Sequence, residues 1–257
     1  MQKTRDISGD NPIKMKTQKI KPTKLRFRKK SAAMATGNFS KIPEKNGRAG
    51  SRIVVITGGS GSGKTLLANF IAEKIYGSDC EVISHDMYYI DKDNFDPEYR
   101  VDYDAPESLD NSLLAEHLIA LKNGEGVDTP IYDFQSKDRL EKTLRVEPKK
   151  IVIVEGILTL AVPEIRRLAD LSIFIHVDDD IRLSRRIIRD FVRGNRGSVG
   201  DGGLEGEFKY YFEYVKPNYK KFIAPLTNVA DIVLRNNGKT PEPMLKRAEN
   251  ILTKFRI

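Results

Sequence analysis

Cysteine is nearly absent from the sequence, and this limits the chemistry that the chain can carry out. Cys80 is the only cysteine among 257 residues. A disulfide within the chain is therefore impossible, and a zinc site built from several cysteines is excluded. Because disulfides are rare in reducing compartments, the composition suits a cytoplasmic protein, and we expect this location.

Long apolar runs are missing as well. No stretch approaches the roughly 18 to 20 consecutive apolar residues that a membrane-spanning helix needs. The N-terminus also lacks the apolar core of a secretory signal peptide. We therefore expect a soluble protein without a membrane span, long enough to bury the core of one α/β domain.

Positive charge is abundant in only one part of the chain. Residues 1–50 hold 14 of the 44 Lys and Arg residues but 3 of the 36 Asp and Glu residues. The remaining residues therefore hold 30 basic and 33 acidic side chains, so they are slightly acidic although the whole chain has a net charge of +8. A nucleic-acid function does not follow from this net charge.

Residues 1–50 have no sustained apolar periodicity, so we expect a disordered basic tail before a folded domain at residues 51–257. Three interpretations of the tail stay open: an inert solvated segment, an organellar or nuclear targeting segment within residues 1–33, and a weak binding patch for nucleic acid or a membrane surface. Asp6 and Asp10 count against a transit peptide, because such segments are poor in acids. Met34 is an alternative start that would remove most of the basic run.

A glycine-rich motif lies between an apolar run and a predicted helix. Its sequence is Gly58-Gly59-Ser60-Gly61-Ser62-Gly63-Lys64-Thr65, which fits the pattern G-x-x-x-x-G-K-[ST]. The glycines allow successive backbone N–H groups and the start of the helix to point at one polyphosphate. In this pattern the lysine reaches the β- and γ-phosphates and the threonine hydroxyl binds Mg²⁺. We therefore predict that the motif binds ATP together with Mg²⁺.

Acidic residues follow two further predicted strands. Asp86 comes just after the strand expected at residues 81–84, and Glu155 ends the apolar run that begins at Ile151. Ligands of open parallel sheets bind beyond the carboxyl ends of the strands, so both acids lie where a substrate binds. Glu155 is a candidate Mg²⁺ ligand together with Thr65. A carboxylate that caps a turn is the alternative interpretation of Glu155.

Arginines recur in the helix predicted after residue 180. Four of them have a spacing of three and four residues, which predicts that they share one face: Arg182, Arg185, Arg186 and Arg189. A glycine-rich segment with Arg193 and Arg196 follows. This combination suits a mobile lid, at about residues 189–206, that closes over phosphates and excludes water. A solvated surface helix is the alternative.

Strands and helices alternate along the chain, which predicts an α/β fold. We expect a doubly wound sheet of five parallel strands. Two extended runs, at residues 127–134 and 139–146, predict a β-hairpin inserted beside the substrate. A helix is expected at residues 208–222, with a kink or break at Pro217.

Seven motifs in a fixed order resemble the uridine/cytidine kinase group of the phosphoribulokinase/uridine kinase family of P-loop kinases. The resemblance covers about residues 52–255 and omits the tail. Its motifs are the phosphate loop and residues 84–89 (SHDMYY), 103–106 (YDAP), 130–134 (PIYDF), 154–158 (VEGIL), 182–190 (RLSRRIIRD) and 215–217 (VKP). It implies ATP-dependent phosphorylation of the 5′-hydroxyl of uridine or cytidine, as in pyrimidine salvage, and it suggests a homo-oligomer.

The resemblance also implies roles for single residues. Asp86 looks like the general base for the 5′-hydroxyl, and Glu155 like the Mg²⁺ acid. The residues that match the family's groups for stabilising the transferred phosphoryl group are Lys64, Arg186, Arg189 and a lid arginine, either Arg193 or Arg196. The residues that match the family's nucleoside pocket are Tyr89, Tyr103, Asp104, Tyr132, Phe134 and Ile157. In this match Asp104 binds the ribose hydroxyls, and Arg186 and Arg189 also contact the substrate.

Two departures from the family pattern fall in the base pocket. Lys137 stands where uridine kinases usually have a histidine, and Tyr210 where they usually have a glutamine. A lysine only donates hydrogen bonds, whereas a neutral histidine also accepts one, so recognition of the acceptor changes. Two alternatives therefore stay open. One is a kinase of the same family for another small alcohol or a sugar phosphate, and the other is a nucleotide-binding regulator without catalysis.

Overall fold

The computed structural model describes residues 44–45, 48–91, 102–192 and 203–255. Most of the predicted tail, and Arg193 and Arg196 of the predicted lid, lie outside the described residues. Within the last part of the tail, two short strands pair antiparallel: β1 (Glu44–Lys45) and β2 (Arg48–Ala49). None of the helices in the described part of the chain combines the length and apolarity that crossing a bilayer requires.

Five parallel strands form the central sheet, as the sequence predicts. Their spatial order is β4 (Cys80–Ser84), β7 (Ile151–Glu155), β3 (Arg52–Gly58), β8 (Leu171–His176) and β9 (Ile232–Arg235). The register pairs Ile56 with Glu155 and Ser84 with Glu155. The carboxyl ends of β4, β7 and β3 therefore lie side by side, and the polar residues that follow them converge.

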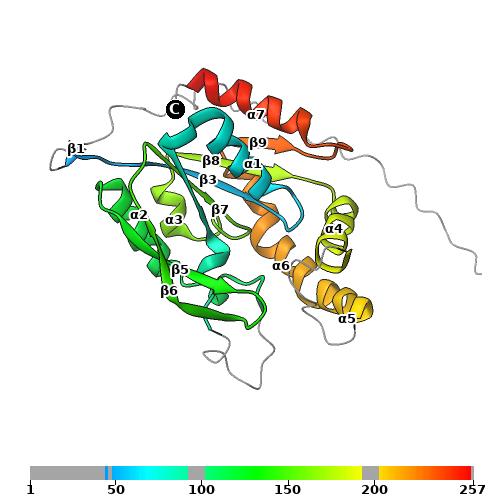
Figure 1. The fold of residues 1–257 in the computed structure, drawn as a ribbon. Coiled ribbons are helices and arrows are strands. Elements are labelled where there is room, and N and C mark those ends of the chain that lie inside the picture. The colour runs from blue at the N-terminus through cyan, green and yellow to red at the C-terminus, as the bar shows by residue number, and fades with distance from the viewer. Residues whose placement is uncertain (1–43, 46–47, 92–101, 193–202, 256–257) are drawn as a thin grey trace, which may run out of the picture. The chain divides into compact units, whose positions relative to one another are not determined.

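Helices cover both faces of the sheet, because the side chains of β3 alternate between two cores. Ile53 and Val55 belong to the core that α2 (Asn111–Lys122) and α3 (Pro163–Leu168) cover. Val54 and Ile56 belong to the core beneath α1 (Lys64–Phe70) and α7 (Glu242–Phe255). Figure 1 shows these two helical layers. The doubly wound arrangement is thus confirmed, and α1 continues as a π-helical segment at Ile71–Tyr76.

The predicted hairpin is present as β5 (Val127–Asp133) and β6 (Asp138–Val146). Arg139 fastens it to the turn after β4. Its Nε donates to the carbonyl of Tyr89 at 2.8 Å and its Nη2 to the carbonyl of Tyr88 at 2.9 Å, and Asp110 lies 3.4 Å from Nη1. The hairpin is therefore held next to the residues that follow β4, the strand at one edge of the sheet.

Of the kink or break expected at Pro217, the break is wrong. Helical segments follow one another without a gap: α5 (Gly203–Tyr210), a π-helical turn (Tyr211–Val215), α6 (Lys216–Asn218), a second π-helical turn (Tyr219–Ile223) and a 3₁₀ turn (Ala224–Asn228). Proline lacks the N–H that an α-helix would use and clashes with the carbonyl four residues earlier. The wider π turns on both sides change this bonding pattern, which lets the helix continue.

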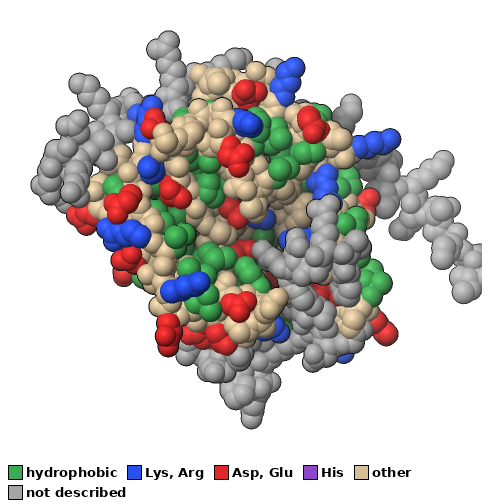
Figure 2. Space-filling view, viewed as in Figure 1, with side chains coloured by type: hydrophobic (Ala, Val, Ile, Leu, Met, Phe, Trp, Pro, Cys, Tyr) green, Lys and Arg blue, Asp and Glu red, His purple; other side chains and the backbone are tan. Residues whose placement is uncertain are grey.

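Charges of both signs are mixed on the face of the molecule seen in Figure 2. Basic and acidic side chains of the described residues alternate there and do not gather by sign. This face therefore presents no extended basic patch of the kind that binds a nucleic-acid backbone.

Candidate active site

The phosphate loop connects β3 to α1, as predicted. Gly61 has a φ of 78° and Gly63 a φ of 96°, in the left-handed region that side chains other than glycine rarely adopt. Space is also restricted, since a Cβ on Gly61 would lie 2.7 Å from the carbonyl oxygen of Arg182. The loop thus depends on glycine for its conformation, and Gly63 sits at the N-terminus of α1, where backbone N–H groups are available to an anion.

Glu155 receives two hydroxyl hydrogen bonds at the end of β7. The Oγ1 of Thr65 and the Oγ of Ser84 each donate to Glu155 Oε1 at 3.1 Å. These contacts follow from the sheet order, since β7 lies between β3 and β4. Burial raises the pKa of Glu155, the neighbouring Asp86 raises it further, and Lys64 acts in the opposite direction.

The same residues suit a magnesium ion. Carboxylate and hydroxyl oxygens are the hard ligands that Mg²⁺ prefers, and the ion usually keeps several waters and binds substrate phosphates. Among the described residues, no group of three or more His, Cys, Asp or Glu side chains converges in a metal-binding arrangement. Thr65 and Glu155 would therefore supply the protein ligands, and the phosphates and water the rest.

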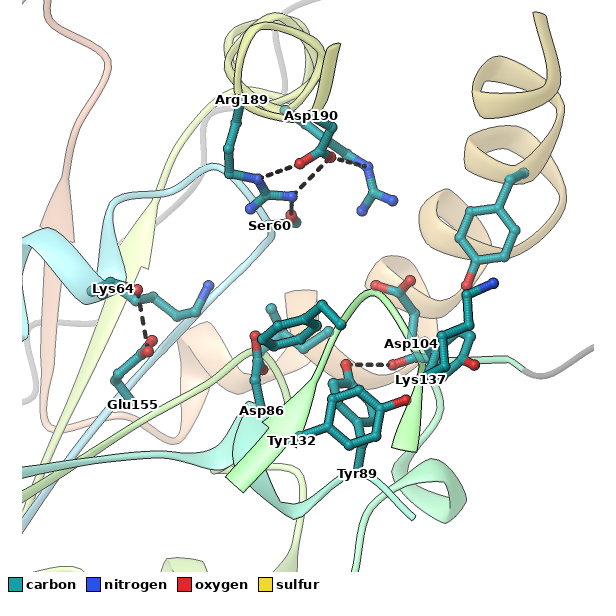
Figure 3. A pocket seen from close by; sticks show the side chains of 16 residues that line it. Ser60, Lys64, Asp86, Tyr89, Asp104, Tyr132, Lys137, Glu155, Arg189 and Asp190 are labelled. Atoms are coloured by element: carbon teal, nitrogen blue, oxygen red, sulfur yellow. Dashed lines mark hydrogen bonds and ion pairs between the residues drawn. The ribbon is translucent and has the colours of Figure 1, made fainter. Parts of the chain in front are cut away.

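Sixteen side chains line one cavity at the carboxyl edge of the sheet (Figure 3). They are Ser60, Lys64, Thr65, Asp86, Tyr89, Tyr103, Asp104, Tyr132, Phe134, Lys137, Glu155, Ile157, Arg186, Arg189, Asp190 and Tyr210. Every catalytic, metal-binding and acceptor-binding candidate that falls within the described residues belongs to this set. Only Asp190 was not singled out by the sequence analysis, although it ends the arginine motif.

The cavity has two ends. Figure 3 shows Lys64 and Glu155 at one end and Asp104 and Lys137 at the other, with Asp86 between them. Arg189, Asp190 and Ser60 lie on the opposite wall from Asp86. A phosphate donor bound at Lys64 and an acceptor bound at Asp104 would thus meet near Asp86.

Aromatic rings form the wall near Asp104. The ring centroid of Tyr132 lies 5.4 Å from those of Tyr89 and Phe134, and Tyr89 and Tyr103 meet edge to face at 5.5 Å. The Tyr89 hydroxyl donates to the carbonyl of Tyr103 at 2.9 Å, which fixes its ring. Such a wall offers flat apolar surface to a planar ring.

Lys137 enters the cavity from the tip of the hairpin in an unusual backbone conformation. It is the only residue other than glycine with a positive φ among those described, at 62°. Its N–H donates to the carbonyl of Asp133 at 2.8 Å, which closes the hairpin turn. Glycine or asparagine usually occupies this conformation, so a lysine at this position does not predict it.

The arginines of α4 (Asp179–Ile187) and of the π-helical turn that follows (Ile188–Val192) do not all point the same way. Arg186 and Arg189 line the cavity, whereas Arg182 stacks 3.7 Å from the ring centroid of Tyr219. Arg185 turns away and donates to the carbonyl of Gly238 at 3.2 Å. The expectation of a single shared face is therefore wrong for Arg185.

Comparison with known families agrees with this geometry. A sequence model of the Phosphoribulokinase / Uridine kinase family matches residues 53–240. The chain belongs to this family. It is accordingly an ATP-dependent phosphotransferase that acts on an alcohol group.

Relatives within this family cover most of the chain. The uridine kinase of Clostridium perfringens is 42% identical over 186 residues, which are 71% of this chain and 86% of that protein. The uridine kinase of Limosilactobacillus reuteri is 36% identical over 189 residues, 73% of this chain and 84% of that protein. A solved structure of D-glycerate 3-kinase from Cryptococcus neoformans has a TM-score of 0.53 at 19% identity, covering 70% of this chain and 82% of that one, and supports the fold alone.

Proposed function

We propose that this family member transfers the γ-phosphoryl group of ATP to the 5′-hydroxyl of uridine or cytidine and forms UMP or CMP. The observation that carries the proposal is the cavity itself, in which Asp86 lies between a phosphate end and an aromatic end. The family, and relatives named uridine kinase at 36 to 42% identity, favour a pyrimidine nucleoside as the acceptor.

The triphosphate of ATP binds at Gly58 to Thr65, where the backbone N–H groups and the Lys64 ammonium donate hydrogen bonds to its oxygens. Thr65 and Glu155 would hold Mg²⁺, which would supply positive charge to neutralise the phosphates. Glu155 must be ionised for this role. Because burial raises the pKa of Glu155, metal affinity should increase with pH.

Asp86 acts as the general base. It accepts the proton of the 5′-hydroxyl as that oxygen forms a bond to the γ-phosphorus and the bond from this phosphorus to the β-γ bridging oxygen breaks. ADP leaves with the bridging oxygen. Arg186, Arg189 and a lid arginine stabilise the charge on the transferring phosphoryl group.

The nucleoside occupies the other end of the cavity. Asp104, which is 6% exposed, accepts hydrogen bonds from the ribose hydroxyls, and the base stacks within the wall of Tyr103, Tyr132, Phe134 and Ile157. Lys137 and Tyr210 face the base edge in place of the histidine and glutamine that the family usually has there.

The test is ATP consumption by the purified chain with a panel of acceptors: uridine, cytidine, purine nucleosides, ribulose 5-phosphate, glycerate and no acceptor. Turnover that depends on uridine or cytidine supports the proposal, and Asp86→Asn should remove it. Asp79→Asn, an exposed acid at the opposite end of β4, is the matched control and should behave like the wild type. Turnover of a sugar phosphate alone would mean that Lys137 binds an anionic acceptor. Consumption independent of any acceptor would favour a nucleotide-binding regulator.

The family resemblance also favours a homo-oligomer. Light scattering on the purified chain would measure its molar mass, and a monomer at micromolar concentration would contradict this part of the proposal.

A further inference from the structure

A buried acid outside the cavity holds one of the cavity's arginines. Glu207 lies on α5 and is 2% exposed. Its Oε1 accepts a hydrogen bond from the Nε of Arg186 at 2.8 Å. No described residue donates a hydrogen bond to its Oε2. Glu207 does not line the cavity, so it is placed to act on the reaction through Arg186.

Arg186 belongs to a compact group of buried charges. Its Nε also lies 3.7 Å from Asp190 Oδ2, and Asp190 receives two hydrogen bonds from Arg189, at 2.7 and 2.9 Å. Burial opposes the charge of Arg186, but Asp104, Glu207 and Asp190 outweigh it and raise the pKa of the guanidinium. Arg186 therefore stays charged although it is 7% exposed.

The contact constrains the direction of the guanidinium. This group is planar and carries five N–H donors in a fixed arrangement. When Nε–H is held by Glu207, the plane is fixed, and the two terminal nitrogens remain for the cavity that Arg186 lines. A flexible arginine would lose much of its effect, because electrostatic stabilisation of a transition state depends on groups that are already in place.

We propose that Glu207 is a positioning residue, which orients Arg186 toward the transferring phosphoryl group and couples this orientation to the position of α5. The inference rests on the role that the proposed function gives to Arg186. Helix α5 is the element that follows residues 193–202, so the contact joins the two sides of the predicted lid, 21 residues apart in sequence.

Two variants separate a positioning role from simple neutralisation of a buried charge. Glu207→Met keeps a similar length but removes the acceptor, whereas Glu207→Gln removes the charge and keeps an oxygen that accepts the Nε–H bond. We expect kcat to fall about 10- to 100-fold in Glu207→Met, the range typical of residues that orient a functional group. Glu207→Gln should recover most of this loss. Equal losses of kcat in both variants would overturn the proposal. Both variants remove the charge of Glu207, so a role that consists only in neutralising Arg186 would be lost equally in each.

A double-mutant cycle with Arg186→Gln tests whether Glu207 acts through Arg186. The Glu207→Met change should cost less than about threefold in kcat when Arg186 is already replaced. An equal penalty in both backgrounds would overturn the proposal in favour of a general effect on the fold. Glu213→Gln, at an exposed acid of the π-helical turn that directly follows α5, is the matched control and should keep wild-type kcat.

The wild-type rate and the variant ratios answer different questions. Turnover of uridine or cytidine by the wild type decides whether the proposed function is correct. The ratios of variant to wild-type kcat are measured with whichever acceptor the wild type phosphorylates. If no acceptor reacts, the proposed function fails, and the cycle is measured on the affinity for Mg·ATP. A coupling between the two positions below about twofold in that affinity would then overturn the inference on its own.

Discussion

Replacing Glu155 with glutamine is expected to raise the stability of the fold and to remove most of the activity. The side chain is 5% exposed at the carboxyl end of β7. Both of its hydrogen bonds come from hydroxyl donors, Thr65 and Ser84, to the same oxygen. A glutamine oxygen accepts the same two bonds. The substitution therefore removes the charge and leaves the local hydrogen bonding in place.

The sign of the stability change follows from the pKa. Burial raises the pKa of Glu155 in the folded chain, with Asp86 adding to this effect and Lys64 opposing it. The ionised carboxylate is therefore less favourable in the folded than in the unfolded chain, by about 1.4 kcal/mol per pKa unit. Above both pKa values glutamine removes this cost. We expect a gain of about 1 kcal/mol, and about 2 to 4 °C in Tm for a domain of this size.

The difference between variant and wild type should depend on pH. Below the unfolded pKa of glutamate, near 4.3, Glu155 is protonated in both states and resembles glutamine, so the difference disappears. It should return as pH rises through the folded pKa. Urea unfolding of the two proteins without nucleotide, at about pH 7.5 and at about pH 3.5, measures this difference. Glu249→Gln, at an exposed acid of α7, is the control and should stay within about 0.5 kcal/mol of wild type.

The activity should change in the opposite direction. Without an ionised ligand from β7, Mg²⁺-dependent turnover should fall by about 10²- to 10³-fold, the usual effect of removing one group that stabilises the transferring charge. A destabilisation of more than about 1 kcal/mol would refute the reasoning, since it would mean that attraction between Glu155 and Lys64 outweighs the burial of the charge. Turnover within a few-fold of wild type would remove Glu155 as a metal ligand.

Three further predictions concern single positions around the cavity. Asp86→Asn should lower kcat by about 10²- to 10⁴-fold with little change in ATP affinity, and a rate within a few-fold of wild type would mean that another group is the base. Lys137→His should raise kcat/KM for cytidine relative to uridine about tenfold, because histidine also accepts hydrogen bonds; Lys142→His, exposed on the same hairpin, should leave the ratio unchanged. Burial lowers the pKa of His85 to about 4, so the folded chain favours neutral His85. Between pH 7 and pH 5 the free energy of unfolding should therefore fall by about 2 kcal/mol more for the wild type than for His85→Gln, as measured by urea unfolding. An equal fall for both proteins would contradict the burial of a neutral imidazole.

Much of the site could be predicted because it depends on local sequence and on the order of strands. The phosphate loop needs glycine at fixed positions, and Gly61 and Gly63 adopt the positive φ that explains them. Asp86 and Glu155 come at the ends of two apolar runs, and parallel strands bring their carboxyl ends to one edge. The roles of these residues stay predictions, but their meeting at one cavity followed from the pattern.

The rest depended on contacts that no local pattern encodes. Glu207 lies on a helix whose sequence does not distinguish it from the exposed Glu205, and only the packing of α5 against Arg186 gives it a partner. Pro217 was expected to kink or break a helix, and the break does not occur, because sequence rules assume α geometry and not π-helical turns on both sides. Arg185 shares the spacing of Arg186 but faces Gly238, which the chain brings there from 53 residues away.

The balance of charge in the cavity gives a reason why ATP should bind as its magnesium complex. Its lining contains the acids Asp86, Asp104, Glu155 and Asp190 and the bases Lys64, Lys137, Arg186 and Arg189, so the two signs are equal in number. Three of the bases already interact with acids: Arg189 binds Asp190, Arg186 binds Glu207, and Lys64 attracts Glu155. A bare triphosphate would have to displace these acids and would then face them at close range. If Glu155 held a magnesium ion, its charge would be neutralised and Lys64 would be available to the phosphates, so metal and nucleotide should bind with positive cooperativity.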